Sequence, residues 1–106
     1  MTIEELRQRI DQLDERLVEL LNERAICALE IGKLKQALGL EVYQPEREAA
    51  VLRHVQSHGM QTGSPLGGDA LARVFERIID EARRIERATA HQGVGTTGPV
   101  RKAEDR

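Results

Sequence analysis

Over its first 38 residues the chain carries an apolar residue at every third or fourth position. Arg24 is the one strongly polar exception in a series made of Ile3, Leu6, Ile10, Leu13, Leu17, Leu20, Cys27, Ile31, Leu34 and Leu38. This spacing is typical of one long amphipathic helix whose apolar seam packs against another helix. Thr2 and Glu5 match a capping box, and Gly39 is suited to end the helix. We therefore expect a helix from about Ile3 to Leu38.

The length of this helix limits how the chain can fold. About 36 residues at a rise of 1.5 Å make a rod of roughly 54 Å. A compact chain of 106 residues has a radius of gyration of only about 13 Å. The rod extends beyond any globule that its own chain can build, so part of its seam is left without cover. We expect a second copy of the chain to cover it, in a homodimer.

A second helix is expected after residue 44. Pro45 suits its first turn, where the acids Glu46 and Glu48 lie near the positive end of the helix. Gly59 is expected to end this helix. A connection rich in Gly, Ser and Pro follows over residues 60–68.

A third helix is expected over about residues 69–90, with an apolar stripe of Leu71, Val74, Ile78, Ala82 and Ile85. Gly, Thr, Pro and charged residues prevail after it without periodicity, so 92–106 is expected to be a flexible tail. The helical domain is then 1–91. No strand pattern occurs, and the expected fold class is all-α, with three helices per chain.

Composition excludes several classes of function. The net charge of −2 and the pI near 5.9 argue against a nucleic-acid surface, and no run approaches the ~20 apolar residues of a membrane span. The single cysteine, Cys27, is typical of a reducing compartment and suits a small core residue in the seam. With no apolar run of a signal peptide at its start, the protein is expected to be cytoplasmic. His54 and His58 have metal-ligand spacing but no evident third ligand, so no metal site is expected.

Arg24 stands where the seam would favour Leu or Ile. A buried arginine is costly without a counter-ion or a ligand, although a register-setting arginine paired with a glutamate is an equally good interpretation. Lys35 lies 11 residues further along, about 20° round the helix and roughly 16 Å along it. Two long cationic side chains leaning toward each other would hold a small dianion. Most such pairs, however, belong to a solvated face.

Polar residues on the other two helices carry weaker signals. Gln44, Arg47 and Glu48 cluster at the start of the second helix, where capping and surface charge are the simpler interpretation. Glu86 borders the apolar stripe of the third helix, where a carboxyl group is usually exposed at its tip.

Five segments, in order and at family spacing, resemble the all-helical class of chorismate mutases. They are LRQRIDQLD at 6–14, LLNER at 20–24, IGKLK at 31–35, PERE at 45–48 and VFERIID at 74–80. The resemblance covers residues 3 to about 90. It implies an intertwined homodimer in which long helices of both chains shape two active sites. It also implies rearrangement of chorismate to prephenate, in phenylalanine and tyrosine biosynthesis. This unimolecular reaction needs neither a nucleophile nor a cofactor.

By position, the resemblance assigns Arg7, Arg24 and Lys35 to the two substrate carboxylates. Lys35 would also donate to the ether oxygen and is an expected catalytic residue. Arg7 lies roughly 42 Å along the helix from Lys35, so one small ligand cannot touch both within a chain. If two such helices pair antiparallel about a midpoint near residue 20, Arg7 of one chain comes opposite residue 33 of the other. The resemblance therefore makes dimerisation a condition of catalysis.

The resemblance assigns the remaining site residues to the substrate hydroxyl and the ether oxygen. Gln44 and Glu48 fall where the family contacts the hydroxyl, and Arg47 matches a supporting arginine. Glu86, the second expected catalytic residue, falls where many members place a Gln, and some a Glu, against the ether oxygen. The chain departs from the family at Gln44, which is often Asp, and at Ala82, where some relatives have a hydroxyl.

Two alternative functions remain open. A sister branch performs isochorismate pyruvate-lyase chemistry on the same scaffold, but Arg47 followed by Glu48 favours the mutase, because Glu48 offers an acceptor for the substrate hydroxyl. The other alternative is a non-catalytic helical dimerisation or regulatory domain. The presence together of Arg7, Arg24, Lys35, Glu48 and Glu86 argues against it.

Overall fold

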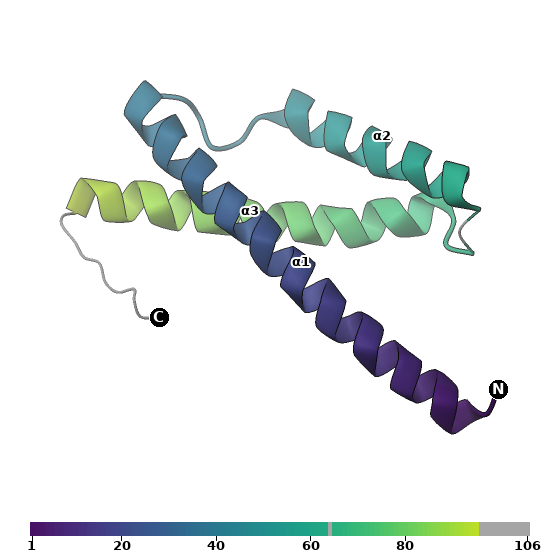
Figure 1. Cartoon of the computed structure of the whole chain (residues 1–106). Coiled ribbons are helices and arrows are strands. Elements are labelled where there is room, and N and C mark those ends of the chain that lie inside the picture. The colour runs from purple at the N-terminus through teal and green to yellow at the C-terminus, as the bar shows by residue number, and fades with distance from the viewer. Residues whose placement is uncertain (64, 96–106) are drawn as a thin grey trace.

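The computed structural model describes residues 1–63 and 65–95, and over these residues it consists of three helices without strands (Figure 1). They are α1 (Ile3–Leu38), α2 (Pro45–Thr62) and α3 (Gly68–Gly95). This confirms the all-α prediction. None of the helices is both long and apolar enough to cross a membrane. Most of the predicted tail, residues 96–106, lies outside the described residues.

Helix α1 has the bounds that its sequence predicts, and local contacts explain both ends. The Oγ1 atom of Thr2 accepts a hydrogen bond from the Glu5 backbone N–H at 3.0 Å, and the Glu5 carboxylate accepts one from the Thr2 N–H at 2.8 Å. Gly39 adopts a left-handed conformation with φ of 69° at the other end. The Leu40 N–H then reaches back to the Lys35 carbonyl at 2.8 Å. Backbone hydrogen-bonding groups at both ends of α1 are thereby bonded to residues close in sequence.

Two helix ends differ from the prediction. Helix α2 continues through Gly59 and ends at Thr62, where Gly63 takes the left-handed conformation with φ of 66°. Gly59 instead allows α3 to come close, since a Cβ added there would overlap the Leu71 side chain. Helix α3 continues to Gly95 rather than ending near residue 90. Residues 68–95 contain no proline, and the first proline after them is Pro99. Proline, the strongest helix breaker, therefore does not interrupt the helix before Gly95.

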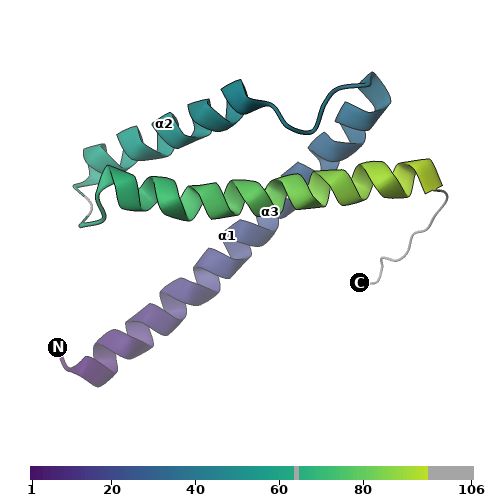
Figure 2. The ribbon, with the colours of Figure 1, turned by 180° about the vertical axis from the view of Figure 1, so that it is seen from behind.

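Helix α3 is the element that holds the chain together. The second half of α1 crosses it, and α2 lies alongside its first part (Figures 1 and 2). The first half of α1 projects away from the other two helices in both views. The crossing of α1 and α3, with the start of α2 beside it, sets the position of the candidate site.

Little apolar surface is buried within one chain. Ala28 and Ile79 are the buried hydrophobic residues of the part that the structure describes. The seam residues in the projecting half of α1 remain between 37% and 68% exposed, namely Ile3, Leu6, Ile10, Leu13, Leu17 and Leu20. Such a long apolar stripe is not typical of the surface of a stable monomer.

Candidate active site

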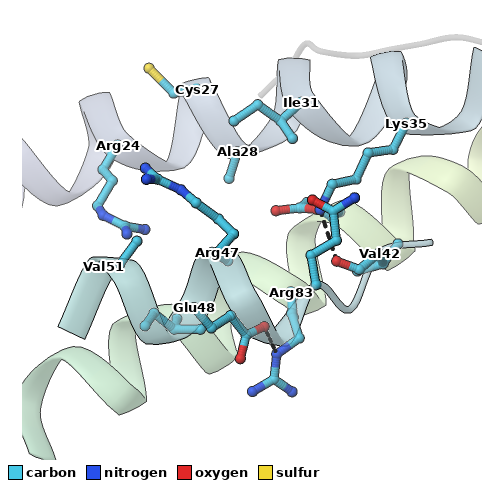
Figure 3. Close-up of a pocket in the computed structure, with 14 residues that line it drawn as sticks. Arg24, Cys27, Ala28, Ile31, Lys35, Val42, Arg47, Glu48, Val51 and Arg83 are labelled. Carbon is cyan, nitrogen blue, oxygen red and sulfur yellow. Dashed lines mark hydrogen bonds and ion pairs between the residues drawn. The ribbon is translucent and has the colours of Figure 1, made fainter. Parts of the chain in front are cut away.

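A cavity of about 410 Å³ lies where the second half of α1, the start of α2 and the second half of α3 meet (Figure 3). Ligand pockets typically have volumes of about 300–1,000 Å³, so a small molecule fits this one. Six of the seven residues expected from the sequence to form a site line it: Arg24, Lys35, Gln44, Arg47, Glu48 and Glu86. They come from the three helices and from the residue before α2, so the spacing along any one helix does not bring them together.

Lys35 and Glu86 form the most buried polar pair of the cavity. The Lys35 Nζ atom lies 2.6 Å from Glu86 Oε1 and 2.8 Å from the Val42 carbonyl oxygen. Only 12% of the Lys35 side chain and 10% of the Glu86 side chain are exposed. Glu86 is therefore not the surface carboxyl of the simpler interpretation. An ammonium group has three donors, so two are used here and one is left for a ligand.

Arg24 and Arg47 face the cavity from α1 and α2 without a protein partner. Within residues 1–63 and 65–89, neither guanidinium takes part in an ion pair or a side-chain hydrogen bond, although the remaining charged groups of the cavity do. No glutamate in this range pairs with Arg24, so the register-setting interpretation has no support within one chain. Figure 3 shows both guanidiniums on the same side of the cavity. Two cations that are unpaired within these residues make this side suitable for an anion.

Arg83 is the residue of the cavity that sequence analysis missed. Its Nε donates to Glu48 Oε2 at 2.7 Å, and its Nη2 donates to Asp80 Oδ1 at 2.7 Å. The hydrogen bond to Glu48 is the main reason why the pKa of the Arg83 guanidinium is raised above its ordinary value, against an opposing effect of burial. Arg83 and Glu48 are 35 residues apart. The only local signal was that Arg83 follows Ile79 by one helical turn, at the border of the apolar stripe.

The remaining predicted polar positions have different environments. Gln44 precedes α2 as its N-cap, but its side chain makes no capping hydrogen bond and lines the cavity instead. Cys27 also lines the cavity and is exposed, so its prediction as a core residue is wrong for the single chain. Arg7 is absent from the lining and lies in the projecting half of α1. Among the described residues, no three His, Cys, Asp or Glu side chains gather in a way that would hold a metal ion.

The charges of the cavity limit what it can bind. Its lining includes four cationic side chains, Arg24, Lys35, Arg47 and Arg83, and two carboxylates, Glu48 and Glu86. With every group ionised, the cavity has a net charge of about +2. A small dianion would neutralise it.

Comparison with known proteins agrees with this arrangement. The model of the family "Chorismate mutase type II" matches residues 6–87, which cover α2 and most of α1 and α3. The chain belongs to this family. The resemblance drawn from the five sequence segments is thereby confirmed, and with it the all-helical fold.

Several curated relatives of this chain are named as bifunctional proteins. The bifunctional chorismate mutase/prephenate dehydratase of Stutzerimonas stutzeri is 37% identical over 92% of this chain and 27% of its own length. The protein of the same name from Neisseria gonorrhoeae is 41% identical over 92% of this chain and 26% of its own length. The T-protein of Haemophilus influenzae is 32% identical over 76% of this chain and 21% of its own length. The chain thus spans about a quarter of the length of these relatives.

Proposed function

We propose that this chain is a chorismate mutase, which rearranges chorismate to prephenate in the biosynthesis of phenylalanine and tyrosine. In this reaction one C–O ether bond breaks and one C–C bond forms within the same molecule, so nothing is gained or lost. The observation that carries the proposal is a net-cationic cavity in which Arg24 and Arg47 are unpaired beside the buried Lys35–Glu86 pair. A dicarboxylate substrate matches these charges, and the chemistry needs no nucleophile.

Binding of the two carboxylates would select the reactive conformer. Arg24 and Lys35 contact them from α1, and Arg7 of the partner subunit completes the set. Holding a flexible molecule in a near-attack geometry removes much of the entropic part of its barrier. Helices suit this task, because their backbone hydrogen bonds hold the Cα and Cβ atoms of the binding residues almost fixed.

The second contribution acts on the breaking bond. Negative charge develops on the ether oxygen in the transition state, and preorganised donors there stabilise it. Lys35 has one N–H left after its bonds to Glu86 and Val42 and donates it to this oxygen. Glu86 acts beside it as a second donor, for which it must carry a proton.

The substrate hydroxyl is bound on the α2 side of the cavity. Glu48 accepts its hydrogen bond through the carboxylate, Gln44 provides a further contact, and Arg47 supports the site from the same helix turn. Glu48 is only partly buried, with 21% of its side chain exposed. An acceptor at this place fits the mutase better than the pyruvate-lyase alternative.

The active form would be a homodimer with two shared sites, in the cytoplasm. The support for a dimer is the uncovered seam from Ile3 to Leu20 and the distance of Arg7 from the cavity of its own chain. Antiparallel pairing of two α1 helices would cover this seam and bring the partner's Arg7 toward the cavity. A cytoplasmic location agrees with the single, exposed thiol of Cys27. The slightly acidic charge of the chain argues against nucleic acid as a partner.

Incubation of the purified protein with chorismate, and separately with isochorismate, tests the proposal. Nuclear magnetic resonance should show conversion to prephenate, an isomer of equal mass, and no release of pyruvate from isochorismate. Pyruvate as the main product would assign the chain to the lyase alternative. No product from either compound, with a folded dimer, would favour the non-catalytic alternative.

A further inference from the structure

Arg83 lines the cavity and connects three parts of the chain there, and Figure 3 shows its contact with Glu48. From α3 it donates to Glu48 on α2 and to Asp80 on its own helix, each at 2.7 Å. Its guanidinium carbon also lies 5.5 Å from the centre of the Tyr43 ring, in the segment between α1 and α2. Within the described residues, no other side chain that lines the cavity contacts all three of these parts through polar or ring interactions.

The start of α2 has little else to orient Glu48. The Gln44 side chain forms no capping hydrogen bond, and the local contact is the backbone bond from the Glu48 N–H to the Gln44 carbonyl at 3.1 Å. That bond fixes the helix turn but leaves the carboxylate free to rotate. The Arg83 guanidinium is planar and its donors have fixed directions, so bonds to two carboxylates hold it and Glu48 together.

Only one of the two carboxylate oxygens of Glu48 is bonded to Arg83. Oε2 accepts from Arg83 Nε, whereas Oε1 remains able to accept from a ligand. Glu48 is also next in sequence to Arg47, whose guanidinium is unpaired. Without Arg83, the Glu48 carboxylate would be drawn toward Arg47 or Arg24 and would neutralise the cations that are needed for the substrate.

We infer that Arg83 is a positioning residue that aims Glu48 at the ring hydroxyl of the substrate and keeps Glu48 away from Arg24 and Arg47. The inference rests on the proposed mutase function and adds a residue that acts on substrate selection through Glu48. A residue in this role sets how strongly the enzyme prefers a substrate with the hydroxyl. It does not itself touch the reacting atoms.

The test compares chorismate with an analogue in which the ring hydroxyl is replaced by hydrogen. In the wild type, kcat/KM should be higher for chorismate. The variant Arg83→Met should lower kcat/KM for chorismate about tenfold or more, as loss of a hydrogen bond to a charged group does, and should change kcat/KM for the analogue less than twofold. An equal loss with both substrates would overturn the inference, because Arg83 would then act on the carboxylates or on the fold.

Two further variants sharpen the comparison. Glu48→Gln should lower the preference for chorismate, and adding Arg83→Met to it should cause no further loss. Fully additive losses would mean that Arg83 does not act through Glu48. Arg84→Met is the matched control, since this neighbour is 75% exposed and pairs with Glu81 on its own helix; it should leave both substrates unaffected.

The ratio of the two kcat/KM values is measured on one preparation, so partial unfolding lowers both values and leaves the ratio unchanged. If Arg83→Met does not fold, Arg83→Lys takes its place, because it keeps a cation but loses the two-armed geometry. The ratio should still fall, and an unchanged ratio would overturn the inference. An inactive wild type would instead contradict the proposed function, so the two failures are distinguishable.

Discussion

Gly32 of α1 lies so close to Glu86 of α3 that a Cβ added to Gly32 would stand 2.9 Å from the Glu86 Cα atom. The contact is between backbones, because the Glu86 carbonyl oxygen would be 3.2 Å from the same Cβ. Lys35 follows Gly32 by about one helical turn, and its Nζ reaches the Glu86 carboxylate from there. The close approach at Gly32 therefore sets the distance across which Lys35 and Glu86 pair.

Gly32→Ala should separate α1 from α3 and lower turnover. Ala adds about 1 kcal/mol of helix propensity, but overpacking against backbone costs about 1–3 kcal/mol. We expect kcat to fall by about 10²-fold, because a shift near 1 Å has this effect on positioned groups. Gly59→Ala is the control: it is another glycine inside a helix that faces α3, but it meets the Leu71 side chain outside the cavity. It should alter the melting temperature while kcat stays near that of the wild type.

Lys35→Ala should remove most activity. Loss of one preorganised donor at a developing charge costs about 3–4 kcal/mol in the transition state, or roughly 10²–10³-fold in kcat. The variant leaves Glu86 buried without its cation, so the melting temperature should be measured together with steady-state turnover. Lys33→Ala is the control, because Lys33 is 57% exposed and pairs with Glu30 on the surface. Near-normal turnover in Lys35→Ala would show that Lys35 has no part in the reaction.

The parts of the fold that depend on neighbours in sequence were predictable. Helix α1 begins and ends where it does because Thr2, Glu5 and Gly39 saturate its ends locally. Gly59 and Gly63 show the opposite case. Both can end a helix, but Gly63 forms the cap, whereas Gly59 lies inside the helix where Leu71 packs against it.

Those residues of the candidate site that belong to a family sequence motif were predictable. The predicted residues that line the cavity were expected from a family pattern, which does not give the distances or contacts between them. Arg83 has no such motif, and its bond to Glu48 joins two helices across 35 residues. Spacing on one helix contains no information about such a partner.

Leu17→Ala should distinguish a dimer from a monomer. Leu17 is 55% exposed in one chain, so its truncation would have little effect on a folded monomer. If Leu17 is buried in the seam between two chains, the same substitution should destabilise the protein by about 2–5 kcal/mol. Glu15→Ala, outside the seam, is the control. Light scattering of the wild type should give the mass of a dimer, and a folded monomer at micromolar concentration would contradict the proposed assembly.

Subunits with different defects should restore one another. An Arg7→Ala chain keeps its own Lys35, and a Lys35→Ala chain supplies an intact Arg7, so their heterodimer has one complete site. Refolding an equal mixture should give about a quarter of wild-type activity, since half of the dimers are mixed and each has one of two sites intact. Each parent alone should be nearly inactive. Verified heterodimers without activity would refute the shared site.

Replacing Glu86 with a permanent hydrogen-bond donor should preserve turnover at saturating chorismate if the role of Glu86 is to donate to the ether oxygen. In the free chain Glu86 forms an ion pair with Lys35. Bound chorismate would bring its own ether oxygen to Lys35, and negative charge develops on that oxygen in the transition state. A carboxylate beside the oxygen would repel this charge, whereas a hydrogen-bond donor would stabilise it.

Glu86→Gln supplies such a donor. A glutamine amide has a similar shape and donates a hydrogen bond, so the variant should keep a kcat near that of the wild type. Its amide can also accept a bond from Lys35, which preserves the contact between α1 and α3 without the charge. The measurement is kcat at saturating chorismate for both proteins, with their folding followed by circular dichroism. A large loss of kcat in the variant would mean that Glu86 is not the donor to the ether oxygen and serves to hold Lys35 through its charge.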